Sequence, residues 1–325
     1  MRVLVTGGSG FIGSRVMDVL AERGHLTINF DLKPPTFERH ADHWFAGDVT
    51  DLDRLNACFD QFQPDAVIHL AAKAEIYSVN WSDFASIHQG TANLIAAIDR
   101  YGRLDRLVNI STQLVIAPGH QPRSLLDYRP YTTYGEAKAY AEGLLLQWAA
   151  PTHWLTVRPA NIWGPNHPSF AKAIWKYIRR RVYLHPATNT PVVRSYGYVR
   201  NTAEQIVTLM ESDPAATYRQ VFYVADTVLD SGLWVDAFAN ALTGKPARRV
   251  PPTVLRAMGW GGDILAKAGR RVPIDSGRVM RMTESYPVPL EPTFALTGLP
   301  RVSLDMGVME TVKWLAADEN HPEKS

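Results

Sequence analysis

A glycine-rich turn directly after the first predicted strand constrains the fold more than any other feature of the sequence. The apolar run at residues 2–6 ends in Gly7-Gly8-Ser9-Gly10-Phe11-Ile12-Gly13, a G-x-x-G-x-x-G pattern that opens a helical pattern. A strand that enters a helix through such a turn presents free backbone N–H groups and the positive end of the helix dipole to an anion. Gly7, Gly10 and Gly13 allow the tight turn, the close approach of a phosphate and the packing of helix on strand. The pattern therefore predicts a phosphate-binding turn.

The next apolar run, residues 26–30, ends in Asp31. An acid about 20 residues past the glycine turn is where a dinucleotide-binding fold hydrogen-bonds the adenosine ribose. Its carboxylate would also repel a 2′-phosphate, so the sequence predicts NAD, although Lys33 nearby leaves room for NADP.

Short apolar runs and helical patterns alternate along the first 160 residues. Alternation of this kind predicts an α/β fold with a doubly wound parallel sheet, and a continuous apolar run such as residues 66–70 predicts a strand buried on both faces. We expect a dinucleotide-binding domain at 1–160, to which about 196–226 also belong. The remaining segments, 161–195 and 227–316, are expected to form a smaller substrate lobe, and 317–325 a tail.

Composition excludes several classes of function. The chain has 325 residues, a net charge of +2 and a single cysteine, Cys58, so an intramolecular disulfide and a cysteine metal cluster are impossible. No run approaches the ~20 apolar residues of a spanning helix. We expect a cytoplasmic protein without a signal peptide, metal, nucleic-acid partner or membrane partner. Residues 252–268 are apolar enough for a surface-binding helix, but Gly261-Gly262 and several charges interrupt them, which favours a place in the core of the lobe.

A second group of residues suggests proton-transfer chemistry. Tyr134 and Lys138 are four residues apart in a strong helical pattern, so both side chains point to one site. A nearby ammonium favours phenolate and lowers the pKa of a tyrosine from about 10, which makes a general base for an alcohol. Thr112 follows a buried strand about 20 residues upstream and offers a hydroxyl to the reacting oxygen.

Together these motifs resemble the extended short-chain dehydrogenases/reductases of the NAD-dependent epimerase/dehydratase family. The resemblance covers most of the first 200 residues and includes 6–13, 47–49, 69–72, 111–112, 130–138 and 158–165. It implies that Tyr134 is the acid/base, that Lys138 also holds the nicotinamide ribose, and that Thr112 bonds the reacting hydroxyl.

The resemblance also implies ligands for the cofactor and for a nucleotide-sugar diphosphate. The cofactor residues would be the turn residues 7–13, including Phe11 and Ile12, together with Asp48, Val49, Leu70, Ala71 and Ala72. The substrate residues would be Asn161, Arg194, Arg278 and, after the Ala-Ala pair, Lys73.

Departures from the family pattern narrow the chemistry. Members that eliminate water or decarboxylate place an acid just after the Ser/Thr, whereas this chain has Gln113 and Leu114. Arg200 stands where acids are usual in the family. His88 lies in the helical pattern at residues 83–101. No role is assigned to either residue.

The sequence therefore predicts an NAD-dependent nucleotide-sugar epimerase, most simply at C4. Two alternatives stay open: a dehydrogenase or ketoreductase of a sugar or of a steroid-like or isoprenoid alcohol, and a non-catalytic nucleotide-sensing regulator. The sugar, the base and the reaction direction are undefined by these motifs. Surplus apolar residues on the helices at 83–101 and 134–149, including Leu144, Leu145, Leu146 and Trp148, predict a homodimer.

Overall fold

The computed structural model describes residues 1–124, 126–149, 151–168, 170, 174–270 and 272–319. The chain divides into two compact units. Unit 1 comprises 1–160, 199–225 and 289–299, and unit 2 comprises 161–198, 226–288 and the residues from Pro300 onward.

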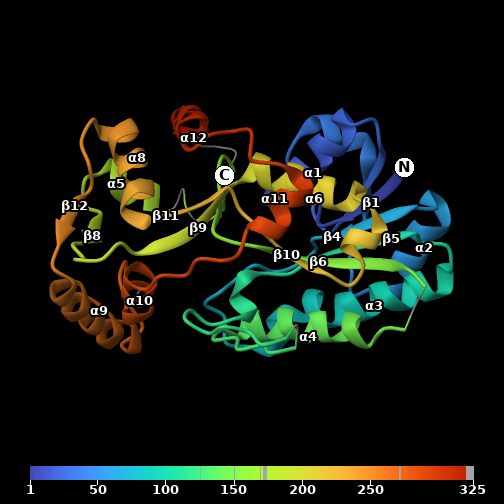
Figure 1. The fold of residues 1–325 in the computed structure, drawn as a ribbon, viewed down its shortest axis with the longest axis horizontal. Coiled ribbons are helices and arrows are strands. Elements are labelled where there is room, and N and C mark those ends of the chain that lie inside the picture. Colours follow the sequence, from blue (N-terminus) through green and yellow to red (C-terminus); the bar gives the residue numbers. More distant parts are fainter. Residues whose placement is uncertain (125, 150, 169, 171–173, 271, 320–325) are drawn as a thin grey trace. The chain divides into compact units, whose positions relative to one another are not determined.

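Unit 1 is built on a seven-stranded sheet in which every neighbouring pair is parallel (Figure 1). The strand order is β10-β6-β5-β4-β1-β2-β3. The strands are β1 (Arg2–Thr6), β2 (Leu26–Asp31), β3 (Trp44–Ala46), β4 (Ala66–His69), β5 (Arg106–Ile110), β6 (His153–Pro159) and β10 (Val221–Val224). This arrangement confirms the predicted doubly wound parallel sheet.

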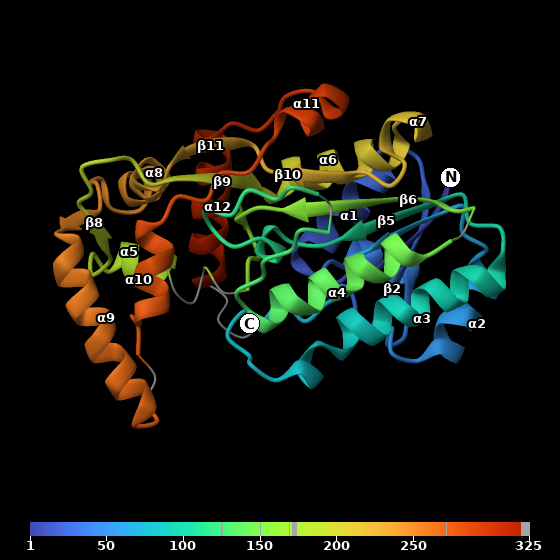
Figure 2. The ribbon, with the colours of Figure 1, turned by 60° about the horizontal axis from the view of Figure 1, so that its bottom comes forward.

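Helices cover both faces of this sheet (Figures 1 and 2). One face packs against α1 (Phe11–Glu22) and α6 (Val199–Glu211), and the other against α2 (Leu52–Phe62), α3 (Ala85–Tyr101) and α4 (Thr133–Gln147). The shorter helices of the unit are η1 (Glu38–His43), η2 (Trp81–Phe84), η3 (Gln113–Val115), α7 (Pro214–Thr217) and α11 (Glu291–Thr297). The strands are therefore buried on both sides, as their apolar runs require.

The strand order places a ligand crevice at the carboxyl ends of β1 and β4. The chain runs outward from β1 to β2 and β3, and from β4 to β5 and β6, so the connections diverge between these two strands. Ligands of open α/β sheets bind at such a switch point.

In its described residues, unit 2 contains two small sheets and five helices. The three-stranded sheet has the order β11-β9-β7, and β8 pairs with β12. Its elements are β7 (Ile162–Trp163), α5 (Ile174–Arg179), β8 (Leu184–Pro186), β9 (Val193–Tyr198), β11 (Thr227–Asp230), α8 (Ser231–Thr243), β12 (Arg248–Val250), α9 (Pro252–Lys267), α10 (Ser276–Thr283) and α12 (Leu304–Glu319).

Aromatic side chains form the centre of unit 2. The Trp163 ring lies 6.0 Å from that of Trp234 and 5.4 Å from that of Phe238, and Trp175 lies 5.3 Å from Phe238. These rings are all buried. In the described part of the chain, no helix is long and apolar enough to cross a membrane.

The expectation that residues 252–268 lie in the core is wrong. They form α9, of which only Leu255, Gly259 and Gly262 are buried. The contacts are made through glycine. A Cβ added at Gly259 would lie 3.0 Å from Cγ2 of Val279 in α10, and one added at Gly262 would lie 2.0 Å from the carbonyl oxygen of Ile274, just before α10. Because backbone packs on backbone here, the larger side chains of α9 point outward.

Two adjacent glycines of α9 test this packing. Gly262→Ala should lower the free energy of unfolding by about 1–3 kcal/mol, because the new methyl group forces α9 away from Ile274. Gly261→Ala should raise it by up to about 1 kcal/mol, since no atom lies within 4 Å of its added Cβ and alanine favours the helix. Urea denaturation of both variants measures the difference. Equal stability of the two would contradict the described contact.

Candidate active site

The glycine turn of unit 1 is packed so closely that Cβ atoms at Gly7 and Gly13 would clash with the backbone. Gly7 has a φ of +77°, and a Cβ added there would lie 2.7 Å from the amide nitrogen of Ala71. A Cβ added at Gly13 would lie 2.1 Å from the carbonyl oxygen of Gly7. Gly10 is the N-cap residue of α1 and supplies no side-chain cap. The start of α1 is therefore packed closely against the end of β1 and carries no side-chain cap, the arrangement in which a helix N-terminus binds a phosphate.

Asp31 is held beside this turn at the end of β2. Its Oδ2 accepts the backbone N–H of Ser9 and its Oδ1 that of Lys33, both at 3.0 Å. The carboxylate is thus tied to the turn itself, at the strand end where a ribose acceptor belongs.

Thr6, the last residue of β1, hydrogen-bonds the residues at the end of β4. The Thr6 carbonyl accepts the N–H of Leu70 at 2.9 Å, and its hydroxyl accepts the N–H of Ala71 at 3.3 Å. The hydroxyl also meets Nδ1 of His69 at 2.7 Å, and burial lowers the pKa of that histidine to about 3. The neutral His69 therefore links β4 to Thr6 at the end of β1. Ala72, three residues further on, is half-buried.

Asp48 and Val49 follow β3, next to the end of β2. The Asp48 carboxylate accepts the N–H of Thr50 at 2.9 Å. Val49 is buried and packs on Gly90 of α3, where an added Cβ would lie 2.6 Å from Val49 Cγ2. The turn, Asp31 and these residues thus follow the carboxyl ends of β1, β2 and β3, the edge at which ligands of open α/β sheets bind.

Thr112 and Tyr134 meet at the carboxyl end of β5. The Thr112 side chain hydrogen-bonds the Tyr134 phenol, and α4 begins beside it because the Thr132 hydroxyl accepts the N–H of Gly135 at 3.0 Å. Burial raises the pKa of Tyr134 to about 12, and the bond to Thr112 opposes part of that rise. The pair can hold a proton between two oxygens in a dry environment.

Lys138 lies one helical turn after Tyr134. Its Nζ donates to the carbonyl of Ile110 at 2.6 Å, which fixes the side chain at the end of β5. Burial lowers the pKa of Lys138 to about 8, and the negative charge of Glu142 opposes this effect. The ammonium form therefore persists near neutral pH.

A buried ion pair that sequence reasoning missed continues this helix face. Glu142 accepts two hydrogen bonds from Arg158 of β6, at 2.9 and 2.7 Å, and a third from the Tyr128 hydroxyl at 3.1 Å. The side chains of Glu142 and Arg158 are 2% and 4% exposed. The signal was an acid four residues after Lys138, in register with Tyr134 and Lys138.

The predicted substrate residues divide between the units. Lys73 is exposed in unit 1, where its Nζ lies 3.2 Å from Asp83. Asn161, Arg194 and Arg278 belong to unit 2.

Within unit 2, Asn161 and Arg194 are brought to the same sheet. Asn161, with a φ of +40°, donates from its amide to the Ser195 carbonyl at 2.8 Å, next to Arg194 on β9. The buried Arg194 donates to the carbonyl of Arg281 at the end of α10, the helix that carries Arg278. Arg278 donates to the Val272 carbonyl at 2.7 Å.

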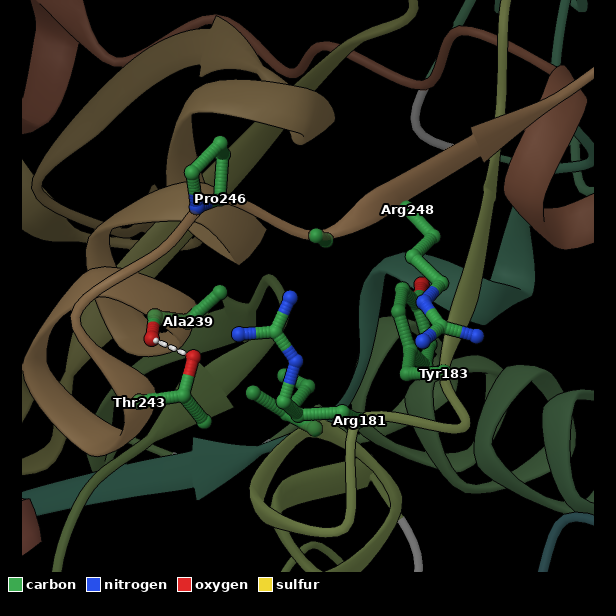
Figure 3. Close-up of a pocket in the computed structure, with 8 residues that line it drawn as sticks. Arg181, Tyr183, Ala239, Thr243, Pro246 and Arg248 are labelled. Carbon is green, nitrogen blue, oxygen red and sulfur yellow. Dashed lines mark hydrogen bonds between the residues drawn. The ribbon is translucent and has the colours of Figure 1, made fainter.

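The basic end of α5 borders a small recess in unit 2 (Figure 3). The recess is about 10 Å³, and Figure 3 shows Arg181 and Arg248 on its sides. It has room for a single water molecule and not for a sugar phosphate.

The residues that depart from the family pattern have structural partners. Arg200 of α6 pairs with Glu22 of α1 at 2.8 Å and with Glu204 at 3.1 Å. His88 of α3 stacks on Trp81 with ring centroids 4.8 Å apart. Among the residues described, no group of His, Cys, Asp and Glu could hold a metal ion.

Removing one partner of the buried pair should destabilise the fold strongly. Glu142→Gln leaves the Arg158 guanidinium buried without a counter-charge, so the free energy of unfolding should fall by about 3 kcal/mol or more. Asp60→Asn is the matched control, because Asp60 binds Arg100 through two oxygens on an exposed surface, and it should change little. Urea denaturation measures both, and equal losses would refute the role given to burial.

The family and fold can now be compared with known proteins. The model of the NAD dependent epimerase/dehydratase family matches residues 3–225, more than half of the chain, which confirms the predicted cofactor, NAD, at the level of the family.

Two curated relatives differ in what they act on. A 3 beta-hydroxysteroid dehydrogenase/Delta 5-->4-isomerase of Mycobacterium tuberculosis is 31% identical over 192 residues, 54% of this chain and 51% of that protein. An N-acetyl-alpha-D-glucosaminyl-diphospho-ditrans,octacis-undecaprenol 4-epimerase of Escherichia coli O157:H7 is 26% identical over 291 residues, 86% of this chain and 84% of that protein. The chain thus spans about half the length of the former.

The fold resembles that of a UDP-glucose 4-epimerase of Thermotoga maritima solved with UDP-glucose, with a TM-score of 0.76 and 22% identity over 98% of this chain and 100% of that one. With the glycine turn, Asp31 and the Thr112–Tyr134 pair in place and the family model matching across them, the chain belongs to the NAD dependent epimerase/dehydratase family.

Proposed function

We propose that the protein is an NAD-dependent epimerase of a nucleotide sugar, acting at C4. The observation that carries the proposal is the buried Tyr134 phenol, bonded to Thr112 and followed on the same helix face by Lys138. Gln113 and Leu114, the two residues after Thr112, supply no carboxylate, so elimination and decarboxylation lack an acid or base there.

The residues of unit 1 would share the work of holding NAD. The backbone at Gly7, Gly10 and Gly13 would bind the pyrophosphate and Asp31 the adenosine ribose. The rest of the rim comprises Phe11, Ile12, Asp48, Val49, Leu70, Ala71 and Ala72. When bound, NAD supplies a reversible hydride acceptor and a positive charge beside the site.

Tyr134 would move the proton at the sugar oxygen. Its phenolate oxygen takes the proton of the C4 hydroxyl during oxidation and returns it during reduction, while the Thr112 hydroxyl orients the same oxygen. Because burial holds the pKa of free Tyr134 at about 12, the phenolate depends on positive charge nearby. Lys138, kept protonated with help from Glu142, would supply one such charge and bind the nicotinamide ribose.

Positively charged residues would bind the diphosphate of the substrate. Arg194 and Arg278 of unit 2 can each pair with phosphate oxygens through two N–H groups, and Asn161 adds an amide. Lys73 of unit 1 would exchange its exposed partner Asp83 for a substrate anion. A neutral alcohol would offer these cations no anionic group to bind.

A net dehydrogenase or ketoreductase is the second candidate. The hydroxysteroid dehydrogenase from M. tuberculosis, 31% identical over about half the chain, favours it. Thr112, Tyr134 and Lys138 would serve that reaction equally well, but the cofactor would leave after each turnover, reduced by a dehydrogenase or oxidised by a ketoreductase.

The two candidates differ in what happens to the cofactor. An epimerase retains NAD through both half-reactions, so the purified protein should carry NAD near one per chain and interconvert a nucleotide sugar with its C4 epimer without added cofactor. Proton NMR of UDP-, GDP-, CDP- and dTDP-linked sugars would detect the epimer. Steady consumption of NADH or NADPH without an epimer would identify the reductase instead.

Tyr134→Phe tests the assigned acid/base. The variant keeps the ring and loses the proton carrier, so turnover should fall by about 10²–10⁴ while NAD binding survives. Tyr140→Phe, on the exposed side of the same helix, is the control and should retain activity. Near-normal turnover of Tyr134→Phe would refute the mechanism.

We also propose that the protein is a homodimer paired through α3 and α4. In the isolated chain Leu145 and Trp148 are already buried, but Trp81 of η2 and Tyr140 of α4 are exposed in contact with each other, 6.0 Å between ring centroids. Light scattering at micromolar concentration should give twice the chain mass. Trp81→Ala with Tyr140→Ala should shift it toward the monomer, and a parent protein that is monomeric would overturn the proposal.

A further inference from the structure

Helix α9 of unit 2 carries a broad apolar surface exposed to solvent. At 3.6 residues per turn, the buried residues Leu255, Gly259 and Gly262 lie on one side, toward α10. An arc of roughly 160° on the other side is apolar. Its large side chains are Val254, Met258, Trp260, Ile264 and Leu265, of which Trp260 is 68% and Ile264 50% exposed.

The position of α9 leaves this arc accessible within unit 2. Figures 1 and 2 both show α9 at the periphery of the unit, alongside α10. Gly261, within the arc, has no atom within 4 Å of an added Cβ. The exposed face is therefore a feature of the helix as a whole and not of one side chain.

The charges that border the arc are mainly positive. Arg256, Asp263 and Lys267 form a narrow stripe between the apolar arc and the buried side, and Arg270 follows the helix. The Asp263 carboxylate accepts the N–H of Ser276 at the start of α10 at 3.1 Å, so it is engaged in holding the two helices together. The exposed stripe thus offers cations to a ligand.

We propose that α9 docks this protein on the surface of an anionic lipid membrane. An apolar helix face with basic residues along its edge lies in the plane of a bilayer at the boundary between headgroups and acyl chains. Trp260 is suited to that boundary, because its ring is apolar and its N–H polar. Arg256, Lys267 and Arg270 would pair with lipid phosphates.

A second copy of the chain fits this surface less well. A helix of 16 residues is about 24 Å long and, with its side chains, about 10 Å wide. The face that one α9 helix presents to another would therefore cover only about 240 Å² per copy. A stable interface buries about 800 Å² per partner. Antiparallel pairing of two α9 helices would also place their basic stripes on the same side of the pair.

This surface contact requires no spanning helix, and it departs from the expectation of no membrane partner. It concerns where the protein works and does not depend on the proposed reaction.

Vesicle flotation of the full chain tests the proposal. At low salt the protein should float with vesicles of phosphatidylcholine and phosphatidylglycerol in about a 7:3 ratio, and bind phosphatidylcholine alone more weakly. Trp260→Gln with Ile264→Gln should reduce the partition coefficient at least about tenfold. Leu233→Gln is the matched control, because Leu233 is an equally exposed apolar residue (62%) on α8, and it should not change partitioning.

Further measurements make each outcome informative. Circular dichroism and melting temperature should be unchanged in the double variant, since both side chains are exposed. Arg256→Gln with Lys267→Gln should weaken binding to the anionic vesicles only. The proposal is overturned if the parent protein does not float, or if the double variant floats as well as Leu233→Gln. A fall in molecular mass of the double variant, without vesicle binding by the parent, would point to a second copy on α9.

Discussion

The architecture of the candidate site depends on backbone contact at the glycine turn. At Gly7, just after β1, the backbone lies so close to the Ala71 backbone after β4 that no Cβ fits between them. At Gly13, α1 lies equally close to the Gly7 carbonyl. A side chain at either position would push apart two neighbouring strands or the strand and its helix. This close packing allows the hydrogen bonds of Thr6 with residues 69–71 and the bond that the Ser9 N–H donates to the Asp31 carboxylate. One steric constraint thus fixes the strand ends at which we expect a dinucleotide to bind.

Burial then sets the electrostatics of Tyr134 and Lys138, to which we assign the proton transfer. Burial raises the pKa of Tyr134 and lowers that of Lys138, so each is pushed toward its neutral form. The same low-dielectric surroundings strengthen the attraction between a phenolate and an ammonium once both form. The negative charge of Glu142 favours the ammonium form of Lys138, and Arg158 in turn donates hydrogen bonds to the Glu142 carboxylate. The buried ion pair therefore supports the chemistry as well as the packing of α4 on β6.

Much of unit 1 could be predicted from the sequence, because its signals are local. The apolar runs gave the strands, and the glycine turn and Asp31 lie within one strand–helix–strand segment. The Glu142–Arg158 pair was not predicted, since the partners are 16 residues apart on different elements and the contact exists only after α4 packs on the sheet. Arg200 was hard to interpret for the same reason: its partner Glu22 is 178 residues away.

The outward face of α9 could not be predicted from hydrophobicity, because Gly259 and Gly262 make the close contacts and the larger apolar side chains stay exposed.

The division of the chain also bears on how the substrate can be inferred. The family match ends at residue 225, before most of unit 2, and relatives with steroid and sugar-lipid names both align with this chain. Under the proposed function, the choice of substrate would depend on side chains of unit 2. The candidates are the buried Arg194 on β9, which lies within the family match, and the partly exposed Arg278 on α10, which lies beyond it. Burying a guanidinium costs desolvation, and hydrogen bonds to carbonyls or to an anionic ligand offset that cost. Arg194 donates through Nη1 to the carbonyl of Arg281, and its guanidinium also lies 5.9 Å from the centroid of the Tyr286 ring. Because a guanidinium pairs with phosphate oxygens through two N–H groups, Arg194 suits the proposed diphosphate-linked sugar better than a neutral alcohol.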